Sequence, residues 1–134
     1  MSEPGTYEAE TNGVVVRVKP TFLPDQSNPP RMWVWAYSVQ IENRSERTVQ
    51  LVSRRWIITD GLGRVEEVEG PGVVGEKPVL RPGAVHSYAS GCPLPTSSGS
   101  MMGTYRMLVD DGDVFDAAIP AFSLDLPGAR RTVN

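Results

Sequence analysis

Three glycines near the middle of the chain have a spacing that could bind a nucleotide. Gly70, Gly72 and Gly75 match the pattern Gly-x-Gly-x-x-Gly. In a dinucleotide site these glycines allow a tight turn and let the backbone approach a pyrophosphate, which lies at the N-terminus of the helix that follows. The spacing therefore indicates a phosphate site only if a helix begins after Gly75.

The residues after these glycines argue against such a helix. Pro78 and Pro82 lie four positions apart, and a proline inside a helix removes one N–H and clashes with the preceding turn. Val73 and Val74 are β-branched and prefer an extended backbone. We therefore expect an extended segment with a glycine hinge or bulge. A phosphate or nucleotide held by successive backbone N–H groups of residues 70–75 is the alternative.

Four aspartates close together, Asp110, Asp111, Asp113 and Asp116, could bind a divalent cation, because hard cations take several oxygen ligands. The spacing does not fit an EF-hand loop, which requires a glycine at its sixth position and a later glutamate. Asp111 and Gly112 are also a strong hairpin signal, for a turn in which both central residues have positive φ. A hairpin is the favoured interpretation, and a metal site at Asp110, Asp111 and Asp113 is the alternative.

Two pairs of neighbouring residues could contact another protein. Arg54 and Arg55 lie where we expect a β-bulge and could bind an acidic partner, although a solvated basic surface also explains them. Met101 and Met102 lie in a stretch rich in Gly and Ser, and flexible methionines suit an adaptable binding surface. Alternatively, the two methionines close one end of the fold.

The other reactive side chains form no recognisable catalytic site. His86 is the single histidine, whereas a zinc site needs further His or Cys ligands. Cys92 has no neighbouring histidine in the sequence to activate it as a nucleophile. Since no spacing of nucleophile, base and orienting residue is present, we expect neither an enzyme nor a cofactor.

Composition narrows the classes of partner. The formal net charge is −3, with 16 acidic and 13 basic residues, which leaves no basic footprint for nucleic acid. No apolar run approaches the roughly 20 residues of a membrane span, so we expect no membrane insertion. A single cysteine excludes an internal disulfide and fits the cytoplasm. The 134 residues fit one domain, which we expect to be ordered over residues 13–127 with tails at 1–12 and 128–134.

The elements that position these residues are predicted to be strands. Val14, Val16 and Val18 alternate with other side chains, and the odd positions of residues 33–43 are mostly aromatic or β-branched. This period of two is typical of a strand with one buried face. Similar segments between turn residues give the predicted strands at residues 13–23, 33–43, 48–60, 64–68, 84–90, 104–110, 114–119 and 121–126.

Several local features refine this pattern. Pro20 predicts an edge strand, because proline cannot donate to a sheet ladder. In residues 48–60 the apolar positions change from odd to even, which predicts a bulge at residues 53–55. The polar residues 43–47 predict a hairpin turn, and residues 91–103 predict a long connection.

About seven short strands without a helix predict an all-β fold, an immunoglobulin-like or fibronectin type III-like β-sandwich of two antiparallel sheets. A single cysteine cannot form the disulfide of antibody domains, which favours the fibronectin type III-like form. An exposed edge strand would also permit a homodimer through that edge. The core between the sheets is expected to contain Trp33, Tyr37, Ile41, Trp56 and Ile58.

Several blocks of the sequence occur in one order over nearly the whole chain. They include Val-Ser-Arg-Arg-Trp-Ile-Ile-Thr-Asp at residues 52–60 and Gly-Pro-Gly-Val-Val-Gly-Glu-Lys-Pro at residues 70–78. With further blocks at residues 43–45, 80–83, 88–91, 99–107 and 119–122, the chain resembles the ApaG family of small bacterial proteins. Arg55 departs from the family pattern, since many members have histidine there, and this removes one conceivable metal ligand.

The resemblance implies a cytoplasmic protein with a fibronectin type III-like sandwich and a link to cobalt resistance and magnesium efflux. Related domains in eukaryotic F-box and polymerase-interacting proteins imply a module that binds a protein partner. The resemblance supplies no catalytic residues. We therefore expect a non-enzymatic protein-interaction module with an indirect role in divalent-cation homeostasis. The alternative is a small-ligand binder, with a nucleotide or pyrophosphate at residues 70–75 or a divalent metal at residues 110–116.

Overall fold

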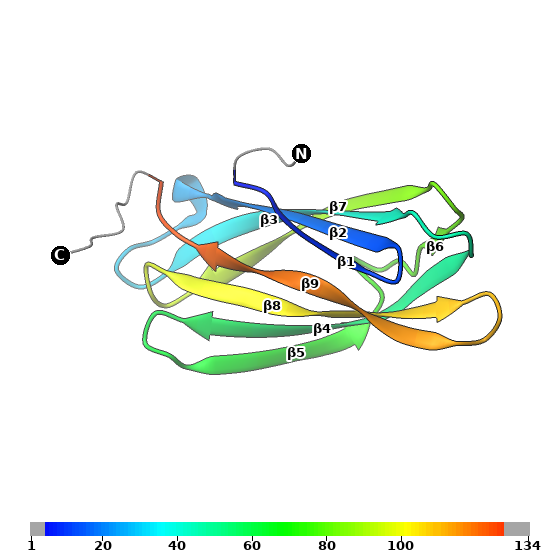
Figure 1. The fold of residues 1–134 in the computed structure, drawn as a ribbon. Coiled ribbons are helices and arrows are strands. Elements are labelled where there is room, and N and C mark those ends of the chain that lie inside the picture. The colour runs from blue at the N-terminus through cyan, green and yellow to red at the C-terminus, as the bar shows by residue number, and fades with distance from the viewer. Residues whose placement is uncertain (1–4, 128–134) are drawn as a thin grey trace.

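The computed structural model describes residues 5–127 and folds as two antiparallel sheets packed face to face (Figure 1). The first sheet has the order β1-β2-β3-β7 and the second has the order β5-β4-β8-β9, with β6 pairing to β4. Within the described residues the one helical element is the 3₁₀ turn η1 (Pro24–Gln26). The all-β sandwich predicted from the sequence is confirmed. The strands are β1 (Tyr7–Thr11), β2 (Val14–Phe22), β3 (Trp33–Asn43), β4 (Val49–Asp60), β5 (Val65–Pro71), β6 (Val79–Leu80), β7 (Val85–Leu94), β8 (Gly99–Val109) and β9 (Val114–Leu124).

The core lies between the sheets, where alternate side chains of each strand point inward. Trp56 of the second sheet packs edge-on against Tyr37 of the first, with ring centroids 5.2 Å apart, and against Phe122 at 6.0 Å. Tyr37, Ile41 and Trp56 are buried as predicted, whereas Trp33 and Ile58 are half-buried.

The N-terminal strand β1 was not expected. The prediction of a tail over residues 1–12 is wrong for Tyr7–Thr11, which pair with β2. Asn12 and Gly13 between these strands have φ values of 50° and 82°, as a two-residue hairpin turn requires. The Asn-Gly pair was therefore the signal that could have revealed β1. The predicted tail at residues 128–134 lies outside the described residues.

The prediction that β2 is an edge strand is wrong, since β2 lies between β1 and β3. Pro20 is nevertheless tolerated in β2, because no strand of the described residues pairs with β2 at this position on the β1 side. The pairing of β1 with β2 begins at Tyr7 opposite Val18, so β1 does not reach Pro20. The N of Leu23 donates to the O of Val34, and the alternation of the ladder then turns the N of Pro20 away from β3. The missing N–H of Pro20 therefore faces a position without a strand.

Two connections and one β-bulge also differ from the expectations. Residues 43–47 turn the chain as predicted, but they connect two sheets, because β3 pairs with β2 and β7 and not with β4. Residues 91–103 are mostly strand, since β7 ends at Leu94 and β8 begins at Gly99. The bulge in β4 exists, but the register shifts between Leu51 and Ser53, slightly before the predicted residues 53–55.

Candidate functional site

The glycine segment of residues 70–75 forms a strand end and a tight turn. The amide of Gly72 donates to the carbonyl of Val52 at 3.0 Å. Val73 and Glu76 exchange two backbone hydrogen bonds of 2.8 and 3.0 Å around Val74 and Gly75, whose φ values are 48° and 79°. In the described chain no helix follows, as Pro78 and Pro82 predicted. The amides of Gly72 and Val73 are thus already donors within the fold.

Close packing explains why Gly72 is a glycine. A Cβ atom at this position would lie 2.1 Å from the carbonyl oxygen of Glu76, so no other residue fits without moving the backbone. Gly72 also has a φ of 59°, in the region that favours glycine. The structural role predicted for the segment is therefore supported, and a phosphate site at Gly70, Gly72 and Gly75 stays a prediction.

Arg54 and Arg55 point in opposite directions from β4. Arg54 donates from Nη1 to the carbonyls of Pro71 and Gly72, at 2.9 and 3.0 Å, and so fixes the glycine segment to β4. Arg55 lies on the outer face and pairs with Glu67 of β5 at 3.0 Å. The two arginines do not form one basic patch.

A pair of tyrosine hydroxyls lies between the sheets near Arg54. The hydroxyls of Tyr88 on β7 and Tyr105 on β8 form a 2.5 Å hydrogen bond. Burial raises the pKa of both tyrosines above the usual range, and the positive charge of Arg54 opposes this effect. Neighbouring His86 is half-buried, and its Nε2 has no hydrogen-bond partner among the described residues. Sequence reasoning did not find the tyrosine pair because it joins strands of different sheets.

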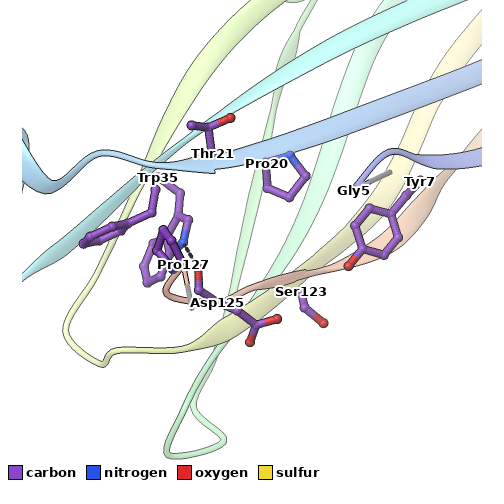
Figure 2. Close-up of a pocket in the computed structure, with 9 residues that line it drawn as sticks. Gly5, Tyr7, Pro20, Thr21, Trp35, Ser123, Asp125 and Pro127 are labelled. Atoms are coloured by element: carbon purple, nitrogen blue, oxygen red, sulfur yellow. Dashed lines mark hydrogen bonds between the residues drawn. The ribbon is translucent and has the colours of Figure 1, made fainter. Parts of the chain in front are cut away.

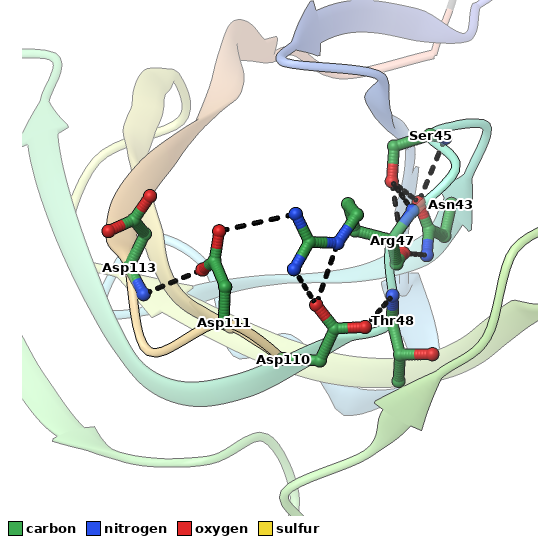
Figure 3. Close-up of polar contacts among 7 residues, drawn as sticks. All are labelled: Asn43, Ser45, Arg47, Thr48, Asp110, Asp111 and Asp113. Carbon is green, nitrogen blue, oxygen red and sulfur yellow. Dashed lines mark hydrogen bonds and ion pairs between the residues drawn. The ribbon is translucent and has the colours of Figure 1, made fainter.

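The acidic hairpin binds an arginine of the chain (Figure 3). Arg47 contacts Asp110 Oδ1 from Nη2 at 2.6 Å and from Nε at 2.8 Å, and Asp111 Oδ2 from Nη1 at 3.2 Å. Its hydrogen bond lowers the pKa of Asp110 below the usual range. Asp113 donates its backbone N to Asp111 Oδ1, and Asp116 pairs with Arg106 at 3.3 Å. The guanidinium of Arg47 therefore already neutralises Asp110 and Asp111, two of the carboxylates that a bound metal ion would need.

The geometry of this hairpin also differs from the expected two-residue turn. Gly112 has a φ of 95°, whereas Asp111 is absent from the residues of positive φ. The amide of Gly112 donates to Val109, and that of Val109 donates to Asp113. The hairpin prediction is confirmed, but its turn is one residue longer than the sequence signal indicated. Among residues 5–127, no group of three or more His, Cys, Asp or Glu is arranged to hold a metal.

Met101 and Met102 also separate. Met101 has 1% of its surface exposed and belongs to the core, whereas Met102 is 48% exposed on the outer face of β8. The interpretation that both methionines close one end of the fold therefore does not apply to Met102. Only Met102 is available to a partner.

A pocket of about 340 Å³ lies between the ends of β2 and β9 (Figure 2). Phe22 and Trp35 form its aromatic part, with ring centroids 5.4 Å apart. The Nε1 of Trp35 donates to the carbonyl of Asp125 at 2.9 Å, which anchors the end of β9. Tyr7 lines the pocket from β1. Sequence reasoning missed this pocket because it placed Tyr7 in a tail.

The four edges of the two sheets differ in charge. β1 has five residues with two glutamates, β5 has three glutamates, and β9 contains Asp116 and Pro120. β7 has ten residues, Val-His-Ser-Tyr-Ala-Ser-Gly-Cys-Pro-Leu, and none is an acid, lysine or arginine. Charges, prolines and short length are the features by which edge strands avoid pairing with other chains. β7 has no acidic, lysine or arginine residue, it is long, and its one proline, Pro93, is next to its last residue.

The backbone of β7 is arranged so that half of its polar groups face away from the sheet. The N of Asn43 donates to the O of Ala84, so by the alternation of an antiparallel ladder residues 86, 88, 90 and 92 of β7 are in hydrogen-bonded pairs with β3. The N–H groups of Val85, Ser87, Ala89 and Gly91 then point toward the free edge. Within residues 5–127, no backbone hydrogen bond outside the ladder involves β7.

Comparison with known proteins identifies a matching family and several similar proteins. The family described as the ApaG domain matches residues 24–109. Protein ApaG of Caulobacter vibrioides is 54% identical over 134 residues, covering 99% of this chain and 96% of the relative. Protein ApaG of Paramagnetospirillum magneticum is 57% identical and covers 96% of this chain and 99% of the relative. A crystal structure named as an ApaA protein from Bordetella pertussis has a TM-score of 0.84 at 46% identity, covering 87% of this chain and 95% of that one. No helix within residues 5–127 has the length and apolar character to cross a bilayer.

Proposed function

The chain belongs to the ApaG domain family, and we propose that it is a non-enzymatic cytoplasmic protein that binds a protein partner by adding a strand to β7. Through this partner it acts indirectly on the handling of cobalt and magnesium ions. The uncharged free edge of β7 is the observation that supports the proposal. The role in cation handling follows from the family resemblance.

Strand addition uses what β7 offers. An extended segment beside a free edge gains main-chain hydrogen bonds, while pockets for alternate side chains give specificity. The outward N–H groups at positions 85, 87, 89 and 91 provide four donors, and each bond contributes about 0.5–1.5 kcal/mol. The segment ends at Pro93, which has no N–H to donate.

The direct test removes one outward donor. Ala89→Pro deletes an N–H that points away from β3, so the ladder within the protein keeps its bonds. We expect the wild-type protein to capture a partner from a lysate of the bacterium that encodes it, and Ala89→Pro to capture much less. Ala89→Val is the matched control, because it changes the exposed side chain at the same position and keeps the N–H. Equal capture by all three proteins would contradict the proposal.

The cation role has a separate test in cells. A strain without the gene is expected to lose cobalt tolerance, and the wild-type gene to restore it. The Ala89→Pro gene should not restore tolerance if the partner acts through β7, whereas Ala89→Val should. Full restoration by Ala89→Pro would show that the effect on cobalt does not require this edge.

A second candidate function is phosphate binding at the turn of Val74 and Gly75. One observation favours it: Val74 is β-branched, 63% exposed and held at a φ of 48°, and backbone strain of this kind gathers at functional sites. Titration with ATP, GTP, Mg²⁺ or Co²⁺ would produce saturable amide shifts at residues 70–75 if this candidate is correct. The same titration tests the metal site predicted at residues 110–116, for which Arg47 is the competing cation.

A further inference from the structure

The inner face of β5 carries a carboxylate at the open side of the sandwich. Glu66 is paired in register with Ile58, which packs against the core, and residues paired across two antiparallel strands share one face. Val68, two positions along β5, also packs against the core. Glu66 therefore points to the side of its sheet that faces the first sheet, and it is exposed.

The inner face of β7 lies across from this carboxylate. Cys92 is buried, and burial, followed by the negative charge of Glu66, raises the pKa of its thiol to about 11. Leu94 of β7 lies against Gly99 of β8, where a Cβ would be 2.6 Å from Leu94 Cδ1, and Gly99 pairs with Asp60 of β4, two positions from Ile58. This end of β7 therefore lies over the part of the second sheet where Glu66 is paired. Glu67 and Glu69 of the same strand both pair with Arg55, whereas the ion pairs of residues 5–127 do not include Glu66.

A positive charge lies further along the same edge. Arg54 is paired in register with Tyr105, whose hydroxyl bonds that of Tyr88 on β7. The guanidinium of Arg54 lies over β5, since a Cβ at Gly70 would be 2.9 Å from its Nη2. Its contacts are with carbonyls of residues 71 and 72, and no ion pair of the described chain includes it. Tyr88 and Cys92 are four positions apart, about 13 Å along a strand. The space beside β7 thus faces a negative charge near Cys92 and a positive charge near Tyr88.

We infer that the partner segment that pairs with β7 carries a lysine or arginine whose side chain faces Glu66, and a residue that is not basic beside Tyr88. This inference rests on the proposed function and adds the chemistry of the partner. Alternate side chains of an added strand face the second sheet. A cation there neutralises a carboxylate that the added strand would partly remove from water, and a second cation beside Arg54 would meet a like charge. The two charges together fix the register and direction of the segment.

The same charges argue against a second copy of this chain as the occupant. Pairing β7 with β7 of another molecule would join the first sheets of the two molecules into one sheet and bring their β5 strands toward each other. Each β5 carries Glu66, Glu67 and Glu69, and like charges facing each other are destabilising. A partner segment with a basic residue fits this edge better.

The test uses a phage-displayed library of random twelve-residue segments as the probe. Segments that bind the wild-type protein but not the Ala89→Pro variant should share a lysine or arginine at one position. The strongest segment should bind Glu66→Lys about tenfold more weakly, since an attraction becomes a repulsion. Selection on Glu66→Lys should instead yield Asp or Glu at that position. Glu69→Lys is the matched control, because it changes the net charge equally on the outer face of β5, and it should leave affinity almost unchanged.

The outcomes separate this inference from the proposed function. Segments that need the Ala89 N–H but bind Glu66→Lys as well as wild type would overturn the inference alone. If every selected segment binds Ala89→Pro as well as the wild-type protein, or if no segment is selected, the proposal of strand addition itself is overturned. Analytical ultracentrifugation checks the other occupant: a dimer that Ala89→Pro dissociates would identify a second copy and overturn the inference.

Discussion

At the scale of single residues, the hydroxyl pair of Tyr88 and Tyr105 is a polar link between the two sheets. Tyr105 has 0% of its surface exposed, so its hydroxyl depends on Tyr88 for a partner. We expect Tyr88→Phe to lower the free energy of unfolding by about 1–3 kcal/mol, the cost of a buried polar group that loses its hydrogen bond. Urea denaturation measures the change.

A double-mutant cycle supplies the control for the tyrosine pair. Tyr88→Phe with Tyr105→Phe leaves no hydroxyl unpaired, so its destabilisation should be smaller than the sum of the two single changes. Additive effects would mean that the two hydroxyls do not depend on each other.

Val74 carries backbone strain that a substitution can relieve. A β-branched residue at a φ of 48° lies in a region that costs roughly 1–2 kcal/mol for side chains with a Cβ, and that Asn tolerates better. Val74→Asn should therefore raise the free energy of unfolding by about 0.5–1 kcal/mol. Val79 is equally exposed, at 59%, but lies in β6, so Val79→Asn should be neutral or destabilising. A loss of stability in Val74→Asn would contradict the account of strain.

The residue types could be predicted from the sequence, but their partners could not. Asp110 and Asp111 were recognised as an acidic cluster, yet Arg47, which binds both, is 63 positions from Asp110. Arg54 and Arg55 are adjacent in sequence, and the register shift in β4 decides which one points inward. The spacing of residues in the sequence shows which charged side chains lie close together. Pairing between distant strands decides whether another residue of the chain already binds them.

At the scale of elements, the turn after β5 depends on Gly72. A Cβ there would lie 2.1 Å from the Glu76 carbonyl oxygen, so Gly72→Ala must shift the backbone. We expect a loss of at least about 2 kcal/mol in the free energy of unfolding. Gly75 has a φ of 79° but open space around it, so Gly75→Ala should cost only about 1 kcal/mol. Equal losses in thermal or chemical denaturation would mean that the clash is not the cause.

Strand positions could be predicted well because the period of two reflects one buried face. The sheet to which each strand belongs could not be predicted. A polar turn reverses the chain in either case, whether the next strand pairs with the preceding strand or joins the facing sheet. At residues 43–47 the deciding contact is that of buried Asn43, whose Nδ2 donates to the carbonyls of Arg47 and Leu80 at 2.7 and 2.9 Å. These bonds hold the crossing between the sheets, and Leu80 is 37 positions away.

At the scale of the whole molecule, the two open sides of the sandwich differ. β1 contacts β9 on one side, where the amide of Ala118 donates to Thr11 Oγ1 at 3.0 Å. On the other side β7 and β5 end their sheets without pairing to each other. The proposed binding edge is therefore on the side where the sandwich remains open. The short strands without a helix predicted a sandwich, but only the strand order identifies its open side.

The thiol of Cys92 and the hydroxyls of Tyr88 and Tyr105 are buried between the sheets, so the free energy of unfolding should fall at alkaline pH. The pKa of Cys92 rises from its usual 9.0 to about 11 in the folded protein, chiefly through burial and then through Glu66. Folding therefore favours the neutral thiol, and its contribution is fully present below pH 9 and is lost as the pH rises through 11. Linkage gives a loss of up to about 3 kcal/mol. The raised pKa values of Tyr88 and Tyr105 act in the same direction above pH 10.

Chemical denaturation between pH 7 and 12 measures this dependence. The free energy of unfolding should be nearly constant up to about pH 9 and then fall, because the unfolded chain releases the thiol proton before the folded chain does. Cys92→Ala removes that proton, so its stability should start to fall only above about pH 10, where the tyrosines ionise. Glu66→Gln should move the onset only slightly, since burial is the larger cause. A wild-type curve that coincides with that of Cys92→Ala between pH 9 and 10 would show that the thiol is not held neutral by the fold.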